Sequence, residues 1–340
     1  MKDLDFMQRA VELARRGVGL TSPNPCVGAV LVQSGKIIGE GWHRQAGGPH
    51  AEVNAVRDAR RRKNRIAGAT LYVTLEPCCT HGRTPPCTEL IIREKIKRVV
   101  VAATDPNPCH AGRGFRLLRR AGIAVTTGVA VREAQALNRA FNHWIIHQQP
   151  WVIGKIAMSL DGRIAVRPGD DRWLTGLSSR RYVHHLRAES DAIIIGAATA
   201  RKDNPALTVR SSAYPRKRQP WRVILTRSGK LSRNLQIFND EHRDRTLVYR
   251  NQSMRNVLND LGKREVTCAL IEGGGEVLGQ ALAEGLVHEI VFFLAPVILG
   301  STGTGIIIPK RRKGIVVSDL SYQRIGQDLL CRSIIAPNLA

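Results

Sequence analysis

Hydrophobic and polar residues follow two different periods along the first half of the chain. Apolar residues recur with helical spacing over 3–16, which predicts a helix. Two apolar runs, 27–32 and 37–41, flank a Ser34-Gly35 turn and predict a β-hairpin. Further helices are expected over 51–62, 88–94 and 115–121, and further strands over 71–75, 98–103 and 123–125. This alternation predicts an α/β layered domain with a mixed sheet.

A second series of apolar segments follows a break in the pattern near 142–150, where Gln148-Gln149-Pro150 marks the expected seam. A chain of 340 residues is long enough for two hydrophobic cores. We therefore expect two α/β domains, residues 1–147 and residues 148–340. The strands expected in the second domain span 151–157, 192–195, 223–225, 246–249, 268–271 and 289–294.

No apolar run has the roughly 20 residues that a membrane-spanning helix needs. The longest one, 290–300, is interrupted by Pro296. The first five residues lack the basic start and the apolar core of a secretory signal. We therefore expect a cytoplasmic protein that does not contact membranes.

The chain is strongly basic, with 52 Lys and Arg against 28 Asp and Glu, or a formal charge of +24. Such a charge favours polyanions and small phosphorylated substrates alike. The excess is divided evenly between the two halves, and only Arg60-Arg61-Arg62-Lys63 forms a dense block, at the end of an expected helix. A general compositional bias and specific nucleic-acid binding therefore both remain open.

Histidine and cysteine residues form a pattern typical of a catalytic zinc site. Pro49-His50-Ala51-Glu52 precedes Glu76-Pro77-Cys78, and Cys87 follows nine positions later. Catalytic zinc takes three protein ligands and leaves a fourth position open, so His50, Cys78 and Cys87 are the expected ligands. Zinc lowers the pKa of a bound water toward about 7, and Glu52 is the expected proton shuttle. The elements match the H-x-E…P-C-x-x-C signature of base deaminases, with eight residues between the cysteines instead of two.

Two other interpretations of the cysteines stay open. Cys79 is a possible ligand in a rearranged site. A closed structural site would use His50, Cys78, Cys79 and Cys87 together, although Glu52 would have no task in it. A disulfide framework is not expected for seven cysteines in a chain of this size without an export signal.

A glycine turn in the second half is a candidate phosphate site. The expected strand 268–271 runs into Glu272-Gly273-Gly274-Gly275, and a helix is expected over 277–283. Free N–H groups at a helix N-terminus attract phosphate. The spacing is not G-x-G-x-x-G, which argues against a standard Rossmann site. Taken alone, the turn could equally be a flexible connection.

Six segments together resemble the bifunctional riboflavin-biosynthesis deaminase–reductase family, in the order expected and over nearly the whole chain. They are 22–28, 74–87, 105–108, 155–165, 203–210 and 271–275. The resemblance implies a cytidine-deaminase-like first domain and a dihydrofolate-reductase-like second domain. It also implies two consecutive reactions: hydrolysis of the C2 amine of 2,5-diamino-6-ribosylamino-pyrimidinone 5′-phosphate, and then reduction of the ribosyl group to a ribityl chain by NADPH.

The resemblance also implies roles for particular side chains. Those expected to line the deaminase pocket are Asn24, Arg83, Asp105 and Asn107. Those expected to contact the reductase substrate are Arg187, Leu207, Arg210 and Glu272. Those expected to contact NADPH are Met158, Trp173, Thr199, Asp203 and the 274–280 turn with Gly274, Gly275 and Gly279. Asn24 and Asn107 are flanked by prolines and could instead be turn residues. Arg227, after an expected strand, could meet the 2′-phosphate of NADPH.

Two positions depart from the family pattern: Thr80, where a histidine is common, and Asp171, where a serine is usual. The main rival interpretation is a nucleic-acid base-editing deaminase whose second half is a basic binding module. The low aromatic content of 5% and the glycine turn count against it. A second rival makes that half an inert oligomerisation domain. We expect a homo-oligomer that acts on a small phosphorylated pyrimidine and not on nucleic acid.

Overall fold

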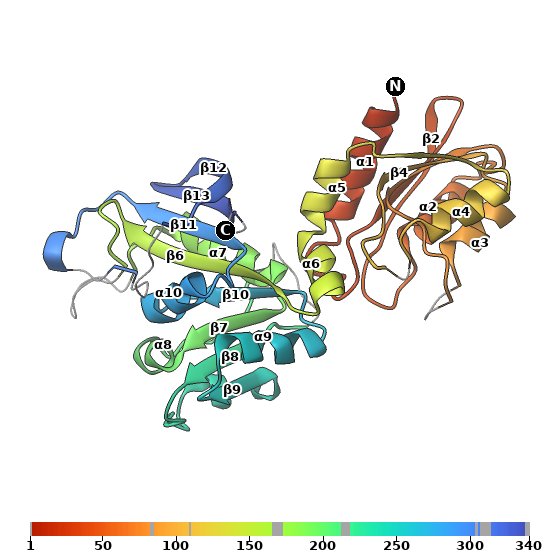
Figure 1. The fold of residues 1–340 in the computed structure, drawn as a ribbon. Coiled ribbons are helices and arrows are strands. Elements are labelled where there is room, and N and C mark those ends of the chain that lie inside the picture. The colour runs from red at the N-terminus through yellow and green to blue at the C-terminus, as the bar shows by residue number, and fades with distance from the viewer. Residues whose placement is uncertain are drawn as a thin grey trace. The chain divides into compact units, whose positions relative to one another are not determined.

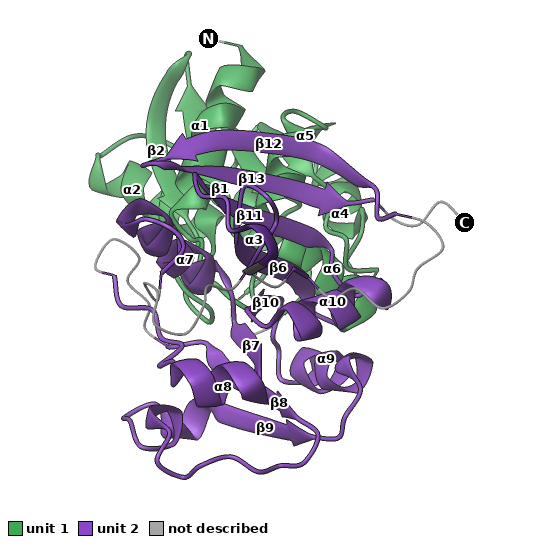
Figure 2. Cartoon of the chain, turned by 90° about the vertical axis from the view of Figure 1, so that its left-hand side faces the viewer, with its two compact units in different colours: residues 1–148 green, residues 149–340 purple. Residues whose placement is uncertain are grey.

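A computed structural model of the chain describes residues 2–81, 85–108, 110–164, 173–211, 218–302, 305–306 and 314–336. The chain forms two compact units, residues 1–148 (unit 1) and residues 149–340 (unit 2). Figure 2 colours them green and purple. Each unit contains its own sheet and its own hydrophobic core, and each is described by itself.

Unit 1 is built on a five-stranded mixed sheet in the order β2-β1-β3-β4-β5 (Figure 1). β1 is antiparallel to β2 and β3, whereas β3, β4 and β5 are parallel. The strands are β1 (Gly28–Gln33), β2 (Lys36–Trp42), β3 (Thr70–Leu75), β4 (Arg98–Ala103) and β5 (Ala124–Thr127). The helices are α1 (Asp3–Arg15), α2 (Ala51–Arg61), α3 (Cys87–Arg93), α4 (Arg113–Arg120), α5 (Val131–Leu137) and α6 (Arg139–His147).

Successive residues of β1 bury their side chains on opposite faces of the sheet, as strand geometry requires. Ala29 and Leu31 join the core under α2, α3 and α4, while Val30 and Val32 join the core under α1 and α5. Figure 1 shows these two helix layers on either side of the strands. Because both faces are covered, unit 1 has three layers, which is the mixed α/β architecture expected for it.

Helix α2 lies unusually close to β2, and a glycine makes this possible. A Cβ atom at Gly41 would lie 2.3 Å from the backbone nitrogen of Ala55 and 2.4 Å from the backbone oxygen of Ala51. A larger residue would push the helix away from the strand. The close contact fixes the position of the first turn of α2, which carries Glu52.

Unit 2 is built on an eight-stranded sheet in the order β12-β13-β11-β6-β10-β7-β8-β9. The six strands from β11 to β9 are parallel, and β13 and β12 extend the sheet as an antiparallel ribbon. The strands are β6 (Trp151–Ser159), β7 (Ala192–Gly196), β8 (Trp221–Thr226), β9 (Thr246–Arg250), β10 (Cys268–Glu272), β11 (Glu289–Ala295), β12 (Val317–Ile325) and β13 (Asp328–Ile335).

Helices cover both faces of this sheet. Those of unit 2 are α7 (Leu177–Glu189), α8 (Ala197–Asp203), α9 (Met254–Lys263) and α10 (Gly275–Ala283), with short 3₁₀ turns at Gln236–Phe238, Arg243–Arg245 and Gly300–Thr302. α9 and α10 pack on the face to which Ile194 and Val223 point, and α8 packs on the face to which Ile195 and Ile224 point. The expected α/β class is confirmed for this unit too.

The segment 142–147, where the apolar pattern breaks, continues helix α6 to His147, and the two units divide after Gln148. None of the residues of α6 is fully buried. The sequence pattern also missed α5, α6, β12 and β13, and it gave no bounds for α7, α8 and α9. In the described part of the chain, no helix is both long and apolar enough to span a membrane.

Candidate metal centre and reductase site

Three sequence segments bring the predicted zinc ligands together in unit 1. His50 immediately precedes α2, Cys78 follows the end of β3, and Cys87 begins α3. The Nδ1 atom of His50 lies 3.5 Å from the Sγ atom of Cys78 and 3.3 Å from that of Cys87. The ligand atoms of all three residues lie within 4.8 Å of one another. One imidazole nitrogen and two sulfurs at this spacing fit a tetrahedral zinc ion with one open position.

The electrostatics of the three side chains also suit a metal ion. Hydrogen bonds from the Cys87 thiol and from His50 lower the pKa of Cys78, which therefore tends to be a thiolate. The backbone N–H of Cys87 also donates to the Cys78 sulfur at 3.2 Å. Cys79 is not part of the metal-ligand cluster found among the described residues, and burial raises the pKa of its thiol.

Glu52 lies in the first turn of α2, two residues beyond His50, and its side chain is 4% exposed. Burial, together with the charge of Cys78, raises the pKa of Glu52 to about 7. A carboxyl with such a pKa can both accept and release a proton near neutral pH, as a proton shuttle must.

His43 holds the predicted pocket residue Asn24, although the sequence analysis did not single it out. The Nδ2 atom of Asn24 lies 3.1 Å from the Nε2 atom of His43, whose Nδ1 atom lies 3.1 Å from the Pro49 carbonyl oxygen. The rings of His43 and His50 make an edge contact with centroids 5.5 Å apart. Burial lowers the pKa of His43, which favours the neutral ring. Through His43, Asn24 is thus linked to Pro49, the residue before the expected zinc ligand His50.

Glu76, the residue directly after β3, binds the backbone of residues 105–114. Its buried carboxylate accepts backbone N–H groups from Asp105 at 3.3 Å, Gly112 at 2.9 Å and Gly114 at 2.9 Å. Asp105 in turn accepts the N–H of Asn107 at 2.9 Å, and burial raises the pKa of Asp105. Arg83, the predicted phosphate contact, lies outside the described residues, as does Asp171.

Three charged side chains meet where the carboxyl end of β10 lies beside the middle of β6 in unit 2. Glu272 and Lys155 are paired in the register of these two parallel strands. Arg187, from α7, donates to both carboxylate oxygens of Glu272 at 2.7 and 2.6 Å. Burial raises the pKa of Glu272, but the charge of Arg187 outweighs it and the net pKa is lowered. Burial also lowers the pKa of Lys155, a residue that the sequence analysis did not select.

The glycine turn forms the N-terminus of α10, which begins at Gly275, two residues earlier than expected. Gly273 and Gly274 have φ angles of 101° and 75°, so this backbone shape requires glycine. A Cβ atom at Gly274 would lie 3.3 Å from the Thr199 hydroxyl oxygen. The turn therefore presents backbone N–H groups beside Thr199, an arrangement that fits a nucleotide phosphate.

The other predicted NADPH contacts have different surroundings. Met158 is half-buried near the end of β6, Gly279 is buried one turn into α10, and Asp203 ends α8. Trp173 is 56% exposed, and the guanidinium of Arg180 lies over its ring, 5.1 Å from the centroid. Arg227 pairs at 3.1 Å with Glu276 in the first turn of α10, and both side chains are exposed.

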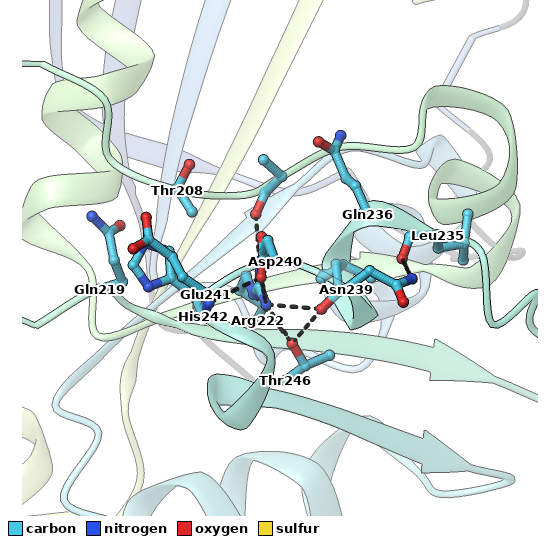
Figure 3. A network of polar contacts seen from close by, with 12 residues as sticks. Thr208, Gln219, Arg222, Leu235, Gln236, Asn239, Asp240, Glu241, His242 and Thr246 are labelled. Carbon is cyan, nitrogen blue, oxygen red and sulfur yellow. Dashed lines mark hydrogen bonds and ion pairs between the residues drawn. The ribbon is translucent and has the colours of Figure 1, made fainter.

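Side chains from elsewhere in unit 2 hold the irregular segment 204–210, which carries Leu207 and Arg210. The fully buried Arg222 donates to the Ala206 carbonyl at 3.1 Å and to Asp240 at 2.8 Å; Figure 3 shows Arg222 between Asp240 and Thr246. The side chains of four other residues also hold the segment. Arg187 donates to the Thr208 carbonyl, Gln219 bonds both backbone groups of Val209, Gln236 donates to the Asn204 carbonyl, and His184 accepts the Arg210 N–H. Leu207 is buried with a φ of 49°, so the segment is fixed in an uncommon conformation.

Two family models match the chain. The RibD C-terminal domain matches residues 150–331, and the cytidine and deoxycytidylate deaminase zinc-binding region matches residues 1–103. Riboflavin biosynthesis protein RibD of Aquifex aeolicus is 39% identical, covering 99% of this chain and 96% of that relative. The Escherichia coli protein of the same name is also 39% identical, over 90% and 91% of the two chains.

Solved structures agree with this relationship. Acinetobacter baumannii RibD superposes with a TM-score of 0.91 and 37% identity, over 98% of this chain and 99% of that one. A Thermotoga maritima diaminohydroxyphosphoribosylaminopyrimidine deaminase/5-amino-6-(5-phosphoribosylamino)uracil reductase superposes with a TM-score of 0.87 and 35% identity, over the same shares.

These matches span both halves, so they confirm the predicted fold classes and do not favour a nucleic-acid editing enzyme with a basic binding module. They also support the expected use of zinc and NADPH, for which the His–Cys–Cys cluster provides the metal site. The chain therefore belongs to the RibD family, the bifunctional deaminase–reductases of riboflavin biosynthesis.

Proposed function

We propose that residues 1–147 hydrolyse the C2 amine of 2,5-diamino-6-ribosylamino-pyrimidinone 5′-phosphate and that residues 148–340 then reduce the ribosyl group to a ribityl chain with NADPH. The observation that carries the first reaction is the cluster of His50, Cys78 and Cys87 with the buried Glu52 beside it. The Thermotoga maritima relative, a deaminase and reductase of such pyrimidines by its name, supports the substrates of both reactions.

In the deaminase site, His50, Cys78 and Cys87 hold the metal and Glu52 moves the proton. A zinc ion in this cluster supplies a Lewis acid that makes a water molecule acidic near neutral pH. Glu52 accepts the proton of the attacking water and delivers it to the amine that leaves as ammonia. The backbone hydrogen bonds around Glu76 and the contact between His43 and Asn24 keep the surrounding pocket in shape.

The deaminase substrate is recognised at the edge of its ring and at its phosphate. Asn24, Asp105 and Asn107 offer amide and carboxylate groups that match the donors and acceptors of a pyrimidinone. The contact of Asp105 with the backbone of Asn107 supports their action as one unit. We assign the phosphate to Arg83, from the family resemblance alone.

In the reductase site, the N-terminus of α10 binds the phosphates of NADPH through the backbone of Gly274 and Gly275. Arg227 lies beside the first turn of this helix, so it is the candidate for the 2′-phosphate. NADPH held here supplies the electron pair for the reduction. The further cofactor contacts follow the family resemblance: Met158, Trp173, Thr199, Asp203 and Gly279.

Leu207, Arg210 and Glu272 contact the reductase substrate. Arg210 is exposed, and its charge suits the substrate phosphate. Arg187 instead donates three hydrogen bonds to Glu272 and to the Thr208 carbonyl. Arg187 therefore contributes by positioning Glu272 and the 204–210 segment. Lys155, beside Glu272, is a further polar group at the reaction site.

We further propose that the chain works as a homo-oligomer in the cytoplasm. Zinc-binding thiolates are stable in a reducing compartment. Strand β12 is the edge of its sheet and exposes Leu320 and Tyr322, at 62% and 74%, which supports a contact with a second copy. Light scattering of the purified chain tests this: a monomer would contradict the oligomer, and loss of an oligomer in Leu320→Lys would support the β12 contact.

Mass spectrometry of the products tests the two reactions together. Without NADPH, the diaminopyrimidinone ribosyl phosphate should lose an amine and gain an oxygen; with NADPH, the same product should also gain two hydrogens. Ammonia release from single-stranded RNA or DNA, with none from the pyrimidine nucleotide, would contradict the proposal. Deamination without NADPH oxidation would contradict the role of residues 148–340.

Replacing Lys155 by Met should lower reductase kcat/KM roughly a hundredfold, an order typical for loss of a charged group at a reacting centre. The melting temperature should stay the same or rise, because the change removes a partly buried charge and leaves the Arg187–Glu272 pair intact. Steady-state NADPH oxidation and thermal unfolding measure the two effects. A fall in both the kcat/KM and the melting temperature would mean that Lys155 only supports the fold.

Replacing Gln219 by Ala should raise the KM for the reductase substrate about tenfold, because it frees both backbone groups of Val209 next to Arg210. The KM for NADPH and the deaminase rate should not change. Initial rates measured against each substrate separately check this. An equal rise in the KM for NADPH and the KM for the pyrimidine would show that residues 204–210 do not contribute specifically to binding the pyrimidine.

A further inference from the structure

A pocket of about 510 Å³ lies beside β2, which forms one edge of the sheet in unit 1. Helices α1 and α2 both pack against this strand, and residues from all three elements line the pocket. Neither Glu52 nor any of the zinc ligands is among the lining residues. The pocket is therefore separate from the metal centre, and none of the functions derived above uses it.

Five arginines and two carboxylates line the pocket, which gives the lining a net formal charge of +3. Both carboxylates already have partners. Asp58 pairs with Arg61 at 2.7 Å and with Arg62 at 2.8 Å, and Glu40 pairs with Arg9 at 2.6 Å. The acidic part of the lining is thus neutralised before any ligand arrives.

The other three arginines of the pocket are Arg16, Arg44 and Arg57. Throughout the described ranges, no carboxylate lies within ion-pair distance of any of them. An arginine keeps its charge at every physiological pH and presents five N–H donors. The pocket therefore offers three cationic groups whose donors are available to an anion.

Trp42 orders two of these arginines. The guanidinium carbon of Arg16 lies 5.0 Å from the centroid of the Trp42 ring, and that of Arg44 lies 4.7 Å from it. Cation–π contact restrains a guanidinium while its N–H edge stays able to donate. Because these side chains are already restrained, binding an anion costs less conformational entropy than it would at freely moving surface arginines.

We propose that this pocket binds a small molecule with two linked phosphates, of the pyrophosphate or nucleoside-diphosphate class. The guanidinium fork matches phosphate oxygens, and three cations favour a ligand with several negative charges. The volume lies in the range of roughly 300–1,000 Å³ that is typical of small-molecule sites. The proposal does not rest on the roles assigned to the two active sites.

The same phosphate chemistry could come from a nucleic-acid strand, but the geometry favours the small ligand. A single strand needs an extended basic groove with several aromatic platforms along it. The pocket has one aromatic residue, Trp42, and arginines on one edge of one sheet. An RNA arm in the experiment distinguishes the two sources.

The test is calorimetric titration of the full zinc-loaded chain at low salt, with saturating NADPH present to fill the reductase site. Pyrophosphate and ADP are the probes, and zinc content is measured before and after because pyrophosphate binds metals. The test variant is Arg16→Gln/Arg44→Gln. The matched control is Arg120→Gln/Arg132→Gln, which removes the same charge at two exposed helix positions away from the pocket. We expect affinity to fall at least about tenfold in the test variant and less than about twofold in the control.

Four outcomes would overturn the proposal. They are no binding of either probe to the native chain, equal weakening in both variants, binding of a single-stranded RNA oligonucleotide but of neither probe, and a changed oligomeric mass in the test variant. The last would make the pocket an interface between copies. Unchanged deaminase kcat and melting temperature in both variants would show that a loss of affinity reflects the pocket and not the fold.

Discussion

Replacing Glu52 by Gln should lower the kcat of deamination by about 10²- to 10⁴-fold while zinc stays bound. Glutamine keeps the size of the side chain in its buried place, but it cannot accept the proton of water or pass it to the amine. His50, Cys78 and Cys87 are unchanged, so the metal content should be native. Ammonia release and elemental analysis of the same preparation measure the two quantities.

The chain provides its own control for this variant. The reductase unit carries none of the affected residues, so NADPH oxidation with the deaminated pyrimidine should proceed at the native rate. Deamination within about twofold of native would remove Glu52 from the mechanism, because a general acid–base group contributes far more than that. Loss of zinc in Glu52→Gln would instead give Glu52 a role in metal binding.

The ligand set could be predicted from sequence because its signals are local. His50 and Glu52 are two residues apart at the start of one helix, and Cys78 and Cys87 flank one connection. Zinc chemistry restricts which residues can appear in such a pattern. The distances between the segments confirm that the three ligands share one place.

The supporting residues could not be found in the same way, because their roles depend on distant parts of the chain. Glu76 acts through the backbone of residues 105–114, and Lys155 meets Glu272 only when β6 and β10 pair. A signal for Lys155 did exist, since a lysine inside an otherwise apolar strand is unusual without a partner for its charge. For His43, between Asn24 and Pro49, no local pattern exists.

Three of the elements missed from sequence, α5, α6 and β12, bury little apolar surface. Nearly every residue of β12 is exposed, and α6 contains none that is fully buried. Hydrophobic periodicity detects an element through the face that it buries. A strand that pairs at the edge of a sheet and exposes both faces gives no alternation to read.

Part of the basic excess serves internal contacts, which the charge count alone could not reveal. Arg187 pairs with Glu272, Arg222 with Asp240, and Arg332 with Glu289. Arg222 is fully buried and Arg187 nearly so, because each has enough acceptors around it to offset the loss of water. Net charge is therefore a poor guide to the ligands of this chain, whereas the local balance of arginines and carboxylates in one pocket is informative.

Replacing Cys87 by Ala should remove most of the zinc and abolish deamination, because the remaining His50 and Cys78 cannot hold the ion alone. Cys79→Ala is the matched control: it removes the same thiol from the residue next to a ligand, outside the cluster. This control should keep native zinc content and a deaminase rate within about twofold of native, since substitutions away from functional contacts have small effects. The melting temperature of unit 1 should fall in Cys87→Ala alone, because the bound metal stabilises the folded state.

Zinc content, measured after dialysis against a weak chelator, separates the interpretations of the cysteines. Equal zinc loss in the two variants would indicate a closed site with four protein ligands, in which Glu52 would have no open position to serve. Native zinc in Cys87→Ala would exclude Cys87 as a ligand, despite the 3.3 Å between its sulfur and the Nδ1 atom of His50. The expected pattern, loss in one variant only, leaves the fourth position open for water, which a hydrolytic deaminase requires.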